Sequence, residues 1–233
     1  MAHDNKFTRG CCFIIAGTNL VGAGKLAFLS ASQSVLRAGS GLCKLLVHDS
    51  QTDIFKPHIL EEMLITYSNI DQLKKILNNT HCNSIIYGCG IENNIFNIDI
   101  LEFLITCPIS LVLDASVFSM IESNKSMFFS LLKLRSSSTI MTPHAGEFKR
   151  IFKVTNDKIS DCICAAKESN CTIVYKGNDT VIGLPTGKAI IDPFSSPYLA
   201  TAGSGDVLCG IIGSFLAQGL SSSKASRLSL IHI

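Results

Sequence analysis

The stretch Ala200-Thr201-Ala202-Gly203-Ser204-Gly205-Asp206 leads directly into the apolar segment Val207-Leu208-Cys209-Gly210-Ile211-Ile212. Small residues leave the backbone N–H groups of a tight turn uncovered, and a helix that starts there adds the positive end of its dipole. The turn can therefore hold an anion. A carboxylate beside that anion would repel phosphate, but it suits a base that removes a proton from an attacking hydroxyl. The pattern indicates phosphoryl transfer, with Asp206 as the base.

A simpler interpretation of these residues is structural. Ser204 or Asp206 caps the helix that follows, and the glycines merely make the turn. Short motifs of this kind match by chance, so the stretch alone leaves both interpretations open.

Composition sets limits on the class of protein. The chain has 233 residues with 47% hydrophobic content, which is enough for one sizeable core, and we expect a single domain over residues 1–233. The net charge is +2, and no Lys/Arg cluster or basic amphipathic stretch is present. These features argue against nucleic acid or a membrane surface as partner and favour a small molecule.

Apolar runs and cysteines indicate the compartment. The first apolar run, Cys11 to Ala16, is far shorter than a signal-peptide core or a membrane span, so we expect a cytoplasmic protein. The ten cysteines include no C-x-x-C pair. Most of them are therefore expected to be reduced, buried, small apolar residues.

Short apolar runs alternate with stretches of helical period, which predicts an α/β fold with a mostly parallel central sheet and helices on both faces. Asn69 or Ser68 is expected to cap a helix, Gly39 to end a helix over Gly24–Ala38, and a further helix to span Val207–Gln218. The expected strands are Cys11–Ala16, Leu42–Val47, Ser84–Tyr87, Ser110–Leu113, Thr139–Met141 and Thr172–Tyr175, with Thr180–Ile182 and Lys188–Ile191 as a hairpin.

Polar and glycine residues follow five of these strands. In parallel sheets, ligands collect beyond the carboxyl ends of the strands, so these residues are expected to share one edge. They are Gly17, Gly88 and Gly90, Asp114, His144, and the pair Lys176-Gly177. Each has an ordinary structural explanation in isolation, as a turn, a cap or a solvated side chain, and their joint placement favours a site.

Several motifs together resemble a known family. The chain is similar to the ADP/ATP-dependent NAD(P)H-hydrate dehydratases, which are nicotinamide repair enzymes with a ribokinase-like fold. The resemblance covers nearly the whole chain. Its most specific part is the combination of Thr-Pro-His-x-Gly-Glu-Phe and Ala-Thr-x-Gly-Ser-Gly-Asp in this order. The motifs are Lys6-x-x-Arg9-Gly10, Gly22-Ala23, Val35 to Gly41, Tyr87-Gly88-Cys89-Gly90, Leu113-Asp114-Ala115, Thr142-Pro143-His144-Ala145-Gly146-Glu147-Phe148, Tyr175 to Thr180, and Leu199 to Asp206.

The resemblance implies a reaction and a set of roles. The terminal phosphate of ADP or ATP moves to the hydroxyl of the S epimer of hydrated NADH or NADPH and leaves as phosphate, which restores the cofactor. Asp206 acts as base, and the amides of Ala202 to Gly205, which include Gly203 and Ser204, hold the developing charge. Residues implied to contact the hydrated nucleotide are Ala23, Gly88 or Gly90, His144 and Asp206. Those implied to contact the phosphate donor are Lys176, Gly177, Asn178, Asp179, Thr180 and Gly205.

The resemblance also implies a magnesium ion that bridges the donor phosphates, although the sequence identifies no metal ligands. Relatives form homo-oligomers, and a homotetramer is expected. Two segments depart from the family pattern: Glu92 or Asn93 stands where a second glycine is usual, and Leu113-Asp114-Ala115-Ser116 lacks a second acidic residue. The final residues, Leu228 to Ile233, resemble a helix that normally continues into further chain, so this copy looks truncated. We also expect no fused epimerase domain, so that the chain acts on one epimer only.

Two alternatives remain open. The chain could be a ribokinase-like kinase of a small molecule such as a vitamin precursor, with the same Asp206 and anion hole. It could also be a catalytically dead protein that binds nucleotides. A stable phosphorylated product would support the kinase, and nucleotide binding without turnover would support the binding protein.

Overall fold

A computed structural model describes residues 5–15, 21–193 and 196–233. The strands are β1 (Cys11–Ile15), β2 (Leu42–His48), β3 (Met63–Tyr67), β4 (Ser84–Tyr87), β5 (Ser110–Leu113), β6 (Thr139–Met141), β7 (Thr172–Tyr175), β8 (Thr180–Gly183) and β9 (Ala189–Asp192). The α-helices are α1 (Val21–Arg37), α2 (Thr52–Phe55), α3 (Ile70–Asn79), α4 (Ile95–Thr106), α5 (Ser116–Ser123), α6 (Lys125–Lys133), α7 (Ala145–Ile151), α8 (Lys158–Ser169), α9 (Ser204–Ala217) and α10 (Ser222–His232).

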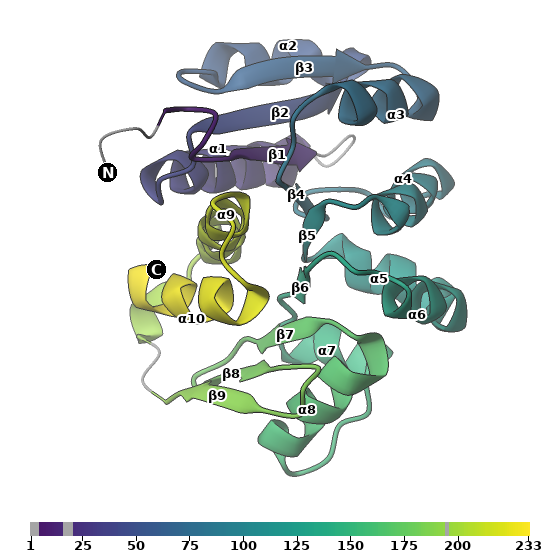
Figure 1. The fold of residues 1–233 in the computed structure, drawn as a ribbon, viewed down its shortest axis with the longest axis vertical. Coiled ribbons are helices and arrows are strands. Elements are labelled where there is room, and N and C mark those ends of the chain that lie inside the picture. Colours follow the sequence, from purple (N-terminus) through teal and green to yellow (C-terminus); the bar gives the residue numbers. More distant parts are fainter. Residues whose placement is uncertain (1–4, 16–20, 194–195) are drawn as a thin grey trace.

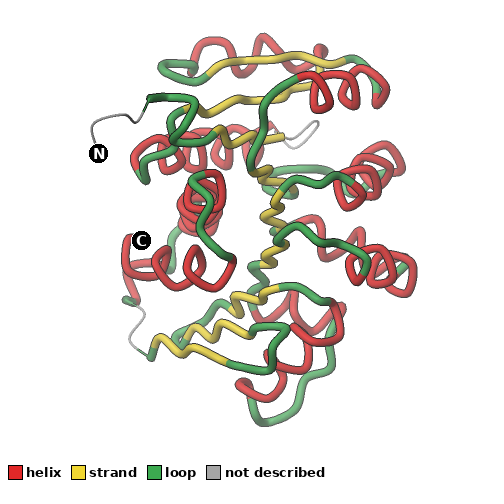
Figure 2. The backbone as a smooth tube through the Cα atoms, viewed as in Figure 1, coloured by secondary structure: helices red, strands yellow, loops and turns green. Residues whose placement is uncertain are grey.

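The described strands form one sheet in the order β3-β2-β1-β4-β5-β6-β7-β8-β9 (Figures 1 and 2). Every pairing from β3 to β7 is parallel, and β8 and β9 add antiparallel strands at one end. The strand order reverses between β1 and β4, because β1 pairs with β2 on one side and with β4 on the other. Such a reversal opens a crevice at the carboxyl ends of the strands, where ligands bind in open α/β sheets.

Helices cover both faces of the sheet, as the sequence predicted (Figure 1). Helices α1, α9 and α10 lie on one face, and α3 to α8 lie on the other. Two apolar clusters result, one between the sheet and each layer of helices. Successive side chains of a strand point to opposite faces of the sheet, which explains the two clusters. In β1, Phe13 and Ile15 belong to one cluster, and Cys12 and Ile14 belong to the other.

The predicted strands are confirmed with small shifts of their ends, including the β8–β9 hairpin. Ala16, the expected end of the first strand, lies outside the described residues. Asn69 caps α3 by accepting a hydrogen bond from the Gln72 N–H. Strand β3 was not predicted. It forms the outer edge of the sheet, so Met63 is 49% exposed and the apolar signal of a buried strand is weak.

Two predicted helix starts were wrong. Helix α1 begins at Val21 instead of Gly24, and α9 begins at Ser204 instead of Val207. Glycine and other small residues interrupt the first turn of each helix, so the regular apolar period that the prediction used begins only later. The predicted close packing on α9 is confirmed: a Cβ on Gly210 would lie 1.9 Å from the Ser34 hydroxyl of α1. The early start places Asp206 inside the first turn of α9.

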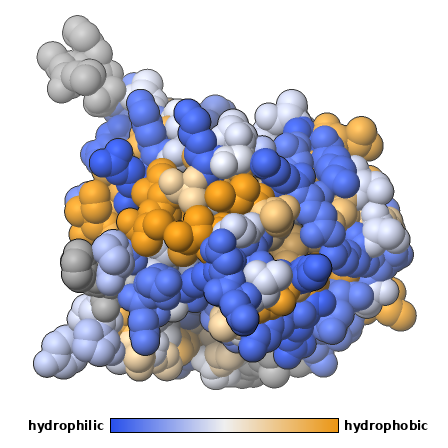
Figure 3. Space-filling view, turned by 90° about the horizontal axis from the view of Figure 1, so that it is seen from below, coloured by the Kyte–Doolittle hydropathy of each residue, from blue (hydrophilic) through white to orange (hydrophobic). Residues whose placement is uncertain are grey.

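Three further features of the molecule are a hydrophobic surface patch, the state of the cysteines and the character of the helices. At the β9 end of the sheet, hydrophobic side chains form a patch framed by hydrophilic ones (Figure 3). Ile191 of β9 is 47% exposed. Eight of the ten cysteines are buried and all are free thiols, as expected. No helix in the described ranges has the length and apolar character needed to cross a bilayer.

Candidate active site

The carboxyl ends of the parallel strands bring the predicted residues to one edge. Strands β4, β5, β6 and β7 are parallel neighbours, so the residues that follow them lie side by side. These are the Gly88–Gly90 turn, Asp114, His144 and Lys176. Gly17, which was expected at the same edge after β1, lies outside the described residues.

The amino end of α9 lies at this edge and keeps backbone donors available. Gly203 occupies the N-cap position in the left-handed region, with φ of +89°, and no side chain caps the helix. Neither Ser204 nor Asp206 caps it, so the expected side-chain cap was wrong, while Gly203 does make the turn. The N–H groups of Gly203, Gly205 and Asp206 have no hydrogen-bond partner among the described residues. The N–H of Ser204 donates to the Thr201 carbonyl at 3.4 Å.

Asp206 is half-buried within that first turn. Its pKa is raised above the ordinary value because burial disfavours the charged carboxylate and because the Asp114 carboxylate lies nearby. Contact with the Cys89 thiol and the charge of Lys176 act in the opposite direction. A raised pKa makes a carboxylate a stronger base, which suits proton abstraction.

Lys176 and Asp114 form an ion pair in the floor of the site. The Lys176 Nζ lies 2.9 Å from the Asp114 Oδ1, and the Asp114 side chain is 5% exposed. Burial lowers the pKa of Lys176, but the Asp114 carboxylate more than offsets this, and the pKa is raised overall. Lys176 therefore stays positively charged near the amino end of α9, where it adds to the attraction for an anion.

The backbone beside Asp114 is strained. Ala115 has φ of +52°, a conformation that is costly for a residue with a Cβ and that often occurs at functional sites. Gly88 packs on this segment, with φ of +114°, and a Cβ there would lie 1.9 Å from the Asp114 carbonyl oxygen. Only glycine fits. Gly88 therefore positions Asp114, and because it is buried it offers little surface to a substrate.

His144 and Glu147 form a reciprocal cap at the start of α7. The His144 Nδ1 accepts hydrogen bonds from the N–H groups of Gly146 and Glu147, and the His144 N–H donates to the Glu147 carboxylate at 2.9 Å. Burial and the charge of Lys176 lower the pKa of His144. Burial and the charge of Asp114 raise the pKa of Glu147 to about 7. The charges of the Lys176–Asp114 pair therefore affect the pKa values of both residues.

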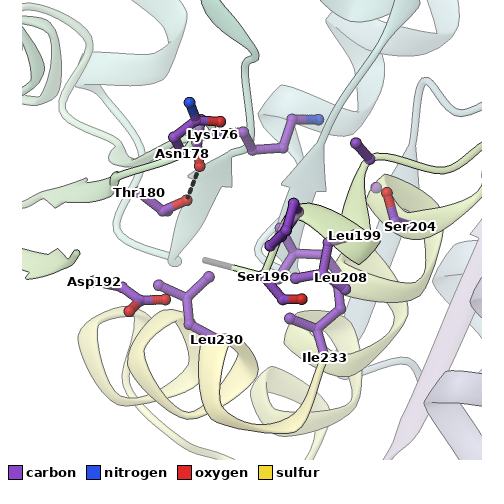
Figure 4. Close-up of a pocket in the computed structure, with 14 residues that line it drawn as sticks. Lys176, Asn178, Thr180, Asp192, Ser196, Leu199, Ser204, Leu208, Leu230 and Ile233 are labelled. Carbon is purple, nitrogen blue, oxygen red and sulfur yellow. Dashed lines mark hydrogen bonds between the residues drawn. The ribbon is translucent and has the colours of Figure 1, made fainter. Parts of the chain in front are cut away.

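A pocket of about 380 Å³ opens next to Lys176 (Figure 4). Lys176, Asn178 and Thr180 line one side of it, and Leu230 and Ile233 lie opposite. The amino end of α9 also contributes, through Ser204, Gly205 and Leu208. Five of the six residues predicted to contact a phosphate donor thus line one pocket: Lys176, Gly177, Asn178, Thr180 and Gly205.

The sixth predicted donor contact, Asp179, does not line this pocket. Its carboxylate pairs with the Lys158 Nζ at 2.9 Å, and its side chain is 58% exposed. The same ammonium also donates to the Asp179 carbonyl. Lys158 lies on α8, so the side chain is drawn toward that helix.

The remaining predicted residues lie at the reversal of strand order. A Cβ on Gly90 would fall 2.4 Å from the Gly24 Cα and 2.8 Å from the Ala23 carbonyl carbon, so the β4 turn packs against the start of α1. Ala23 is exposed there. Cys89, between the two glycines, contacts both Asp206 and Cys209. Sequence analysis named no role for Cys89, Cys209 or Glu147, and no spacing could have joined them.

The doubly covered sheet, with a glycine turn, a half-buried carboxylate and a pocket at its carboxyl edge, defines the ribokinase-like class. A ribokinase-like superfamily protein from Enterococcus faecalis has the same fold, with a TM-score of 0.82 at 20% identity over 100% of this chain and 79% of that one. A family model described as NAD(P)H-hydrate dehydratase matches residues 12–230. The chain therefore belongs to the NAD(P)H-hydrate dehydratase family.

Individual relatives agree with this membership. The bifunctional NAD(P)H-hydrate repair enzyme of Mycobacterium leprae is 29% identical over 231 residues, which cover 96% of this chain and 44% of the relative. The ADP/ATP-dependent NAD(P)H-hydrate dehydratase from Bacillus subtilis, co-crystallised with ATP and Mg²⁺, has a TM-score of 0.77 at 25% identity. That match covers 99% of this chain and 80% of the other. The chain spans less than half the length of the curated relatives it matches.

Proposed function

We propose that this chain dehydrates hydrated NADH or NADPH in a reaction that consumes ADP or ATP. The observation that carries the proposal is the placement of Asp206, half-buried and with a raised pKa, next to uncovered backbone donors and a pocket. A phosphoryl group needs donors and a cation, and an attacking hydroxyl needs a base. This edge of the sheet offers all three.

The residues divide the work in the proposed mechanism. Asp206 takes the proton of the ring hydroxyl of the S epimer as its oxygen attacks the terminal phosphorus of the donor. The bond from that phosphorus to the bridging oxygen of the donor breaks, so that AMP leaves from ADP, or ADP from ATP. The N–H groups of Gly203 and Gly205, together with Lys176, stabilise the charge on the transferred phosphoryl group. The phosphorylated oxygen then leaves as inorganic phosphate when its bond to the ring carbon breaks, and loss of a ring proton restores the reduced nicotinamide. Loss of one such backbone donor typically costs about 3 kcal/mol of barrier.

Substrate and donor enter from different sides of Asp206 in this proposal. The phosphate donor occupies the pocket beside Asn178 and Thr180. The hydrated nucleotide lies along the other rim, with Ala23, Gly90 and His144. Asp206 lies between the two groups because its turn touches the pocket through Gly205 and the Gly88–Gly90 turn through Cys89.

Magnesium is the expected companion of the donor phosphates. Mg²⁺ prefers oxygen ligands and usually binds through one or two carboxylates together with phosphates and water. The described residues form no cluster of carboxylates that would hold it, and the one cluster of metal-ligating side chains contains two thiols. These residues do not fit a dedicated magnesium site, so we assign no residue to the ion and no step to it.

The test is a recovery assay. The purified protein is incubated with hydrated NADH, Mg²⁺ and either ADP or ATP, and the return of the reduced-nicotinamide absorbance is followed. Recovery that requires a nucleotide supports the proposal and identifies the donor. A phosphorylated product that accumulates without dehydration would instead indicate a kinase. Nucleotide binding without any turnover by a folded sample would indicate a binding protein.

A further inference from the structure

Two buried thiols and a buried carboxylate meet beneath Asp206. The sulfur atoms of Cys89 and Cys209 and one oxygen of Asp114 all lie within 4.8 Å of one another. All three residues are nearly inaccessible, with exposures of 5%, 0% and 4% for Cys89, Cys209 and Asp114. They come from three distant parts of the chain: the turn after β4, the end of β5, and the second turn of α9.

We propose that Cys89, Asp114 and Cys209 form a binding site for a thiophilic divalent cation of the Zn²⁺ and Cd²⁺ class. Two sulfur ligands and one oxygen ligand are the donor set that such cations prefer, whereas Mg²⁺ requires oxygen ligands. The site is therefore distinct from that of any Mg²⁺ carried by a nucleotide.

The separations fit tetrahedral coordination. Zn–S bonds of about 2.3 Å and Zn–O bonds of about 2.0 Å place a sulfur and an oxygen about 3.5 Å apart around one ion. The Cys209 Sγ lies 3.5 Å from the Asp114 Oδ2. The Cys89 sulfur lies within 4.8 Å of the Cys209 sulfur and of one oxygen of the Asp114 carboxylate. Small side-chain adjustments are therefore enough to bring three ligands onto one ion.

The carboxylate has an oxygen to spare. Lys176 uses the Asp114 Oδ1, so the Oδ2 that faces Cys209 is available to a cation while the ion pair stays intact. Asp206 lies outside these three residues but contacts Cys89, and in the proposed site its carboxylate is the fourth ligand. Binding one divalent cation displaces the two thiol protons to solvent, so the site gains no net charge from the ion and the two thiolates together.

A cation at this position would inhibit the enzyme. It would draw Asp206 into coordination, and a coordinated carboxylate cannot accept the proton of the ring hydroxyl. This consequence rests on the proposed role of Asp206, but binding of the cation does not. The two are therefore measured separately.

The binding experiment titrates the reduced protein with Cd²⁺, without nucleotide, and follows the ultraviolet charge-transfer absorbance of cadmium thiolates. We expect one tight Cd²⁺ per chain, competed by Zn²⁺. Cys89→Ala and Cys209→Ala are each expected to raise the apparent Kd at least about tenfold. The matched control is Cys164→Ala, which removes the exposed thiol of α8 and should leave the titration unchanged. Circular dichroism establishes that each variant is folded.

Three results would overturn the site: no charge-transfer band at stoichiometric Cd²⁺, an unchanged band in folded Cys89→Ala and Cys209→Ala, or a band lost in Cys164→Ala. A wild-type mass lower by two hydrogens, together with no Cd²⁺ binding, would assign the pair to a disulfide instead. Inhibition of the recovery assay by Zn²⁺, reversed by a chelator, tests the consequence. If Cd²⁺ binds but no turnover is found under any condition, the proposed function fails and the cation site stands.

Discussion

The two ends of the central strands differ in how their polar groups are satisfied. Near the amino ends of β5 and β6, Arg135 donates to the carbonyls of Leu104, Cys107 and Ile109 at 3.1, 2.9 and 2.6 Å, to the Ile105 carbonyl, and to the Thr139 hydroxyl. At the carboxyl ends, Asp206 has a raised pKa and the N–H groups of Gly203 and Gly205 are unpaired among the described residues. The hydrogen-bonded carbonyls at the amino ends stabilise the fold, whereas the unpaired N–H groups at the carboxyl ends can bind a ligand.

A pocket is present at both the amino and the carboxyl ends of the central strands, so a pocket alone does not distinguish them. Arg135 also borders a pocket of about 250 Å³, together with Cys107, Pro108 and Leu134. Its guanidinium already donates to carbonyls at and beyond the end of α4. It therefore has little capacity to bind a ligand in this pocket. The comparison predicts that substitutions at the carboxyl end change turnover and that substitutions at the amino end change stability.

The largest expected effect is on turnover, in Asp206→Asn. The amide cannot accept the proton of the hydroxyl, so we expect the recovery rate to fall at least about 10²-fold. Nucleotide affinity measured by calorimetry should change by less than about twofold, since the shape of the turn is kept. Asp53→Asn is the control, because the Asp53 side chain is 96% exposed far from the site. Near-normal turnover in Asp206→Asn would remove the proposed base.

Arg135→Met tests the opposite end. The substitution removes the donor of several carbonyls at once, so we expect the free energy of unfolding in urea to fall by about 3 kcal/mol. The recovery rate of the folded variant should stay within about twofold of the wild-type rate. Arg37→Met, on the exposed surface of α1, is the control and should cost less than about 0.5 kcal/mol. A large loss of turnover with unchanged stability would break the comparison.

The sequence predicted the convergence at the carboxyl edge well, because parallel strands place their ends together whatever their separation along the chain. Asp114, His144 and Lys176 are separated by tens of residues and still meet. The sequence could not show which of these side chains pair. Whether Lys176 is free or held by Asp114 depends on side-chain packing that leaves no periodic signal.

The sequence missed the cysteine cluster and misplaced Asp179 for the same reason. Cys89 and Cys209 are 120 residues apart, so no ligand spacing could reveal that they meet. Asp179 lies within a run of predicted donor contacts, in the turn before β8. The direction of its side chain is set by Lys158, which lies 21 residues earlier on helix α8. A motif fixes the path of the backbone near a ligand, but neighbouring elements decide where each side chain points.

A smaller effect is expected from pH at the rim of the site. Since the folded pKa of Glu147 is about 7 and its ordinary value is 4.5, the protonated carboxyl stabilises the fold below pH 4.5. That contribution is lost as the pH rises through about 7. We expect the free energy of unfolding to fall by about 2 kcal/mol over this window. Glu147→Gln should reduce this decrease of the free energy of unfolding with pH. The control is Glu122→Gln, which replaces a half-exposed glutamate of α5 and should leave the decrease unchanged. An unchanged slope in Glu147→Gln would contradict the assignment.

The smallest effect separates two neighbours, Asn178 and Asp179. Asn178 lines the pocket and Asp179 pairs with Lys158, so Asn178→Ala is expected to weaken nucleotide binding about fivefold and Asp179→Asn less than twofold. The exposed ion pair itself contributes little, and Asp179→Asn should lower the free energy of unfolding by less than about 1 kcal/mol. Calorimetric titration with ADP and with ATP measures both affinities. If Asp179→Asn weakened binding more than Asn178→Ala, the carboxylate would have to leave Lys158 when the nucleotide arrives, and the family motif would then predict its position better than the ligand-free structure does.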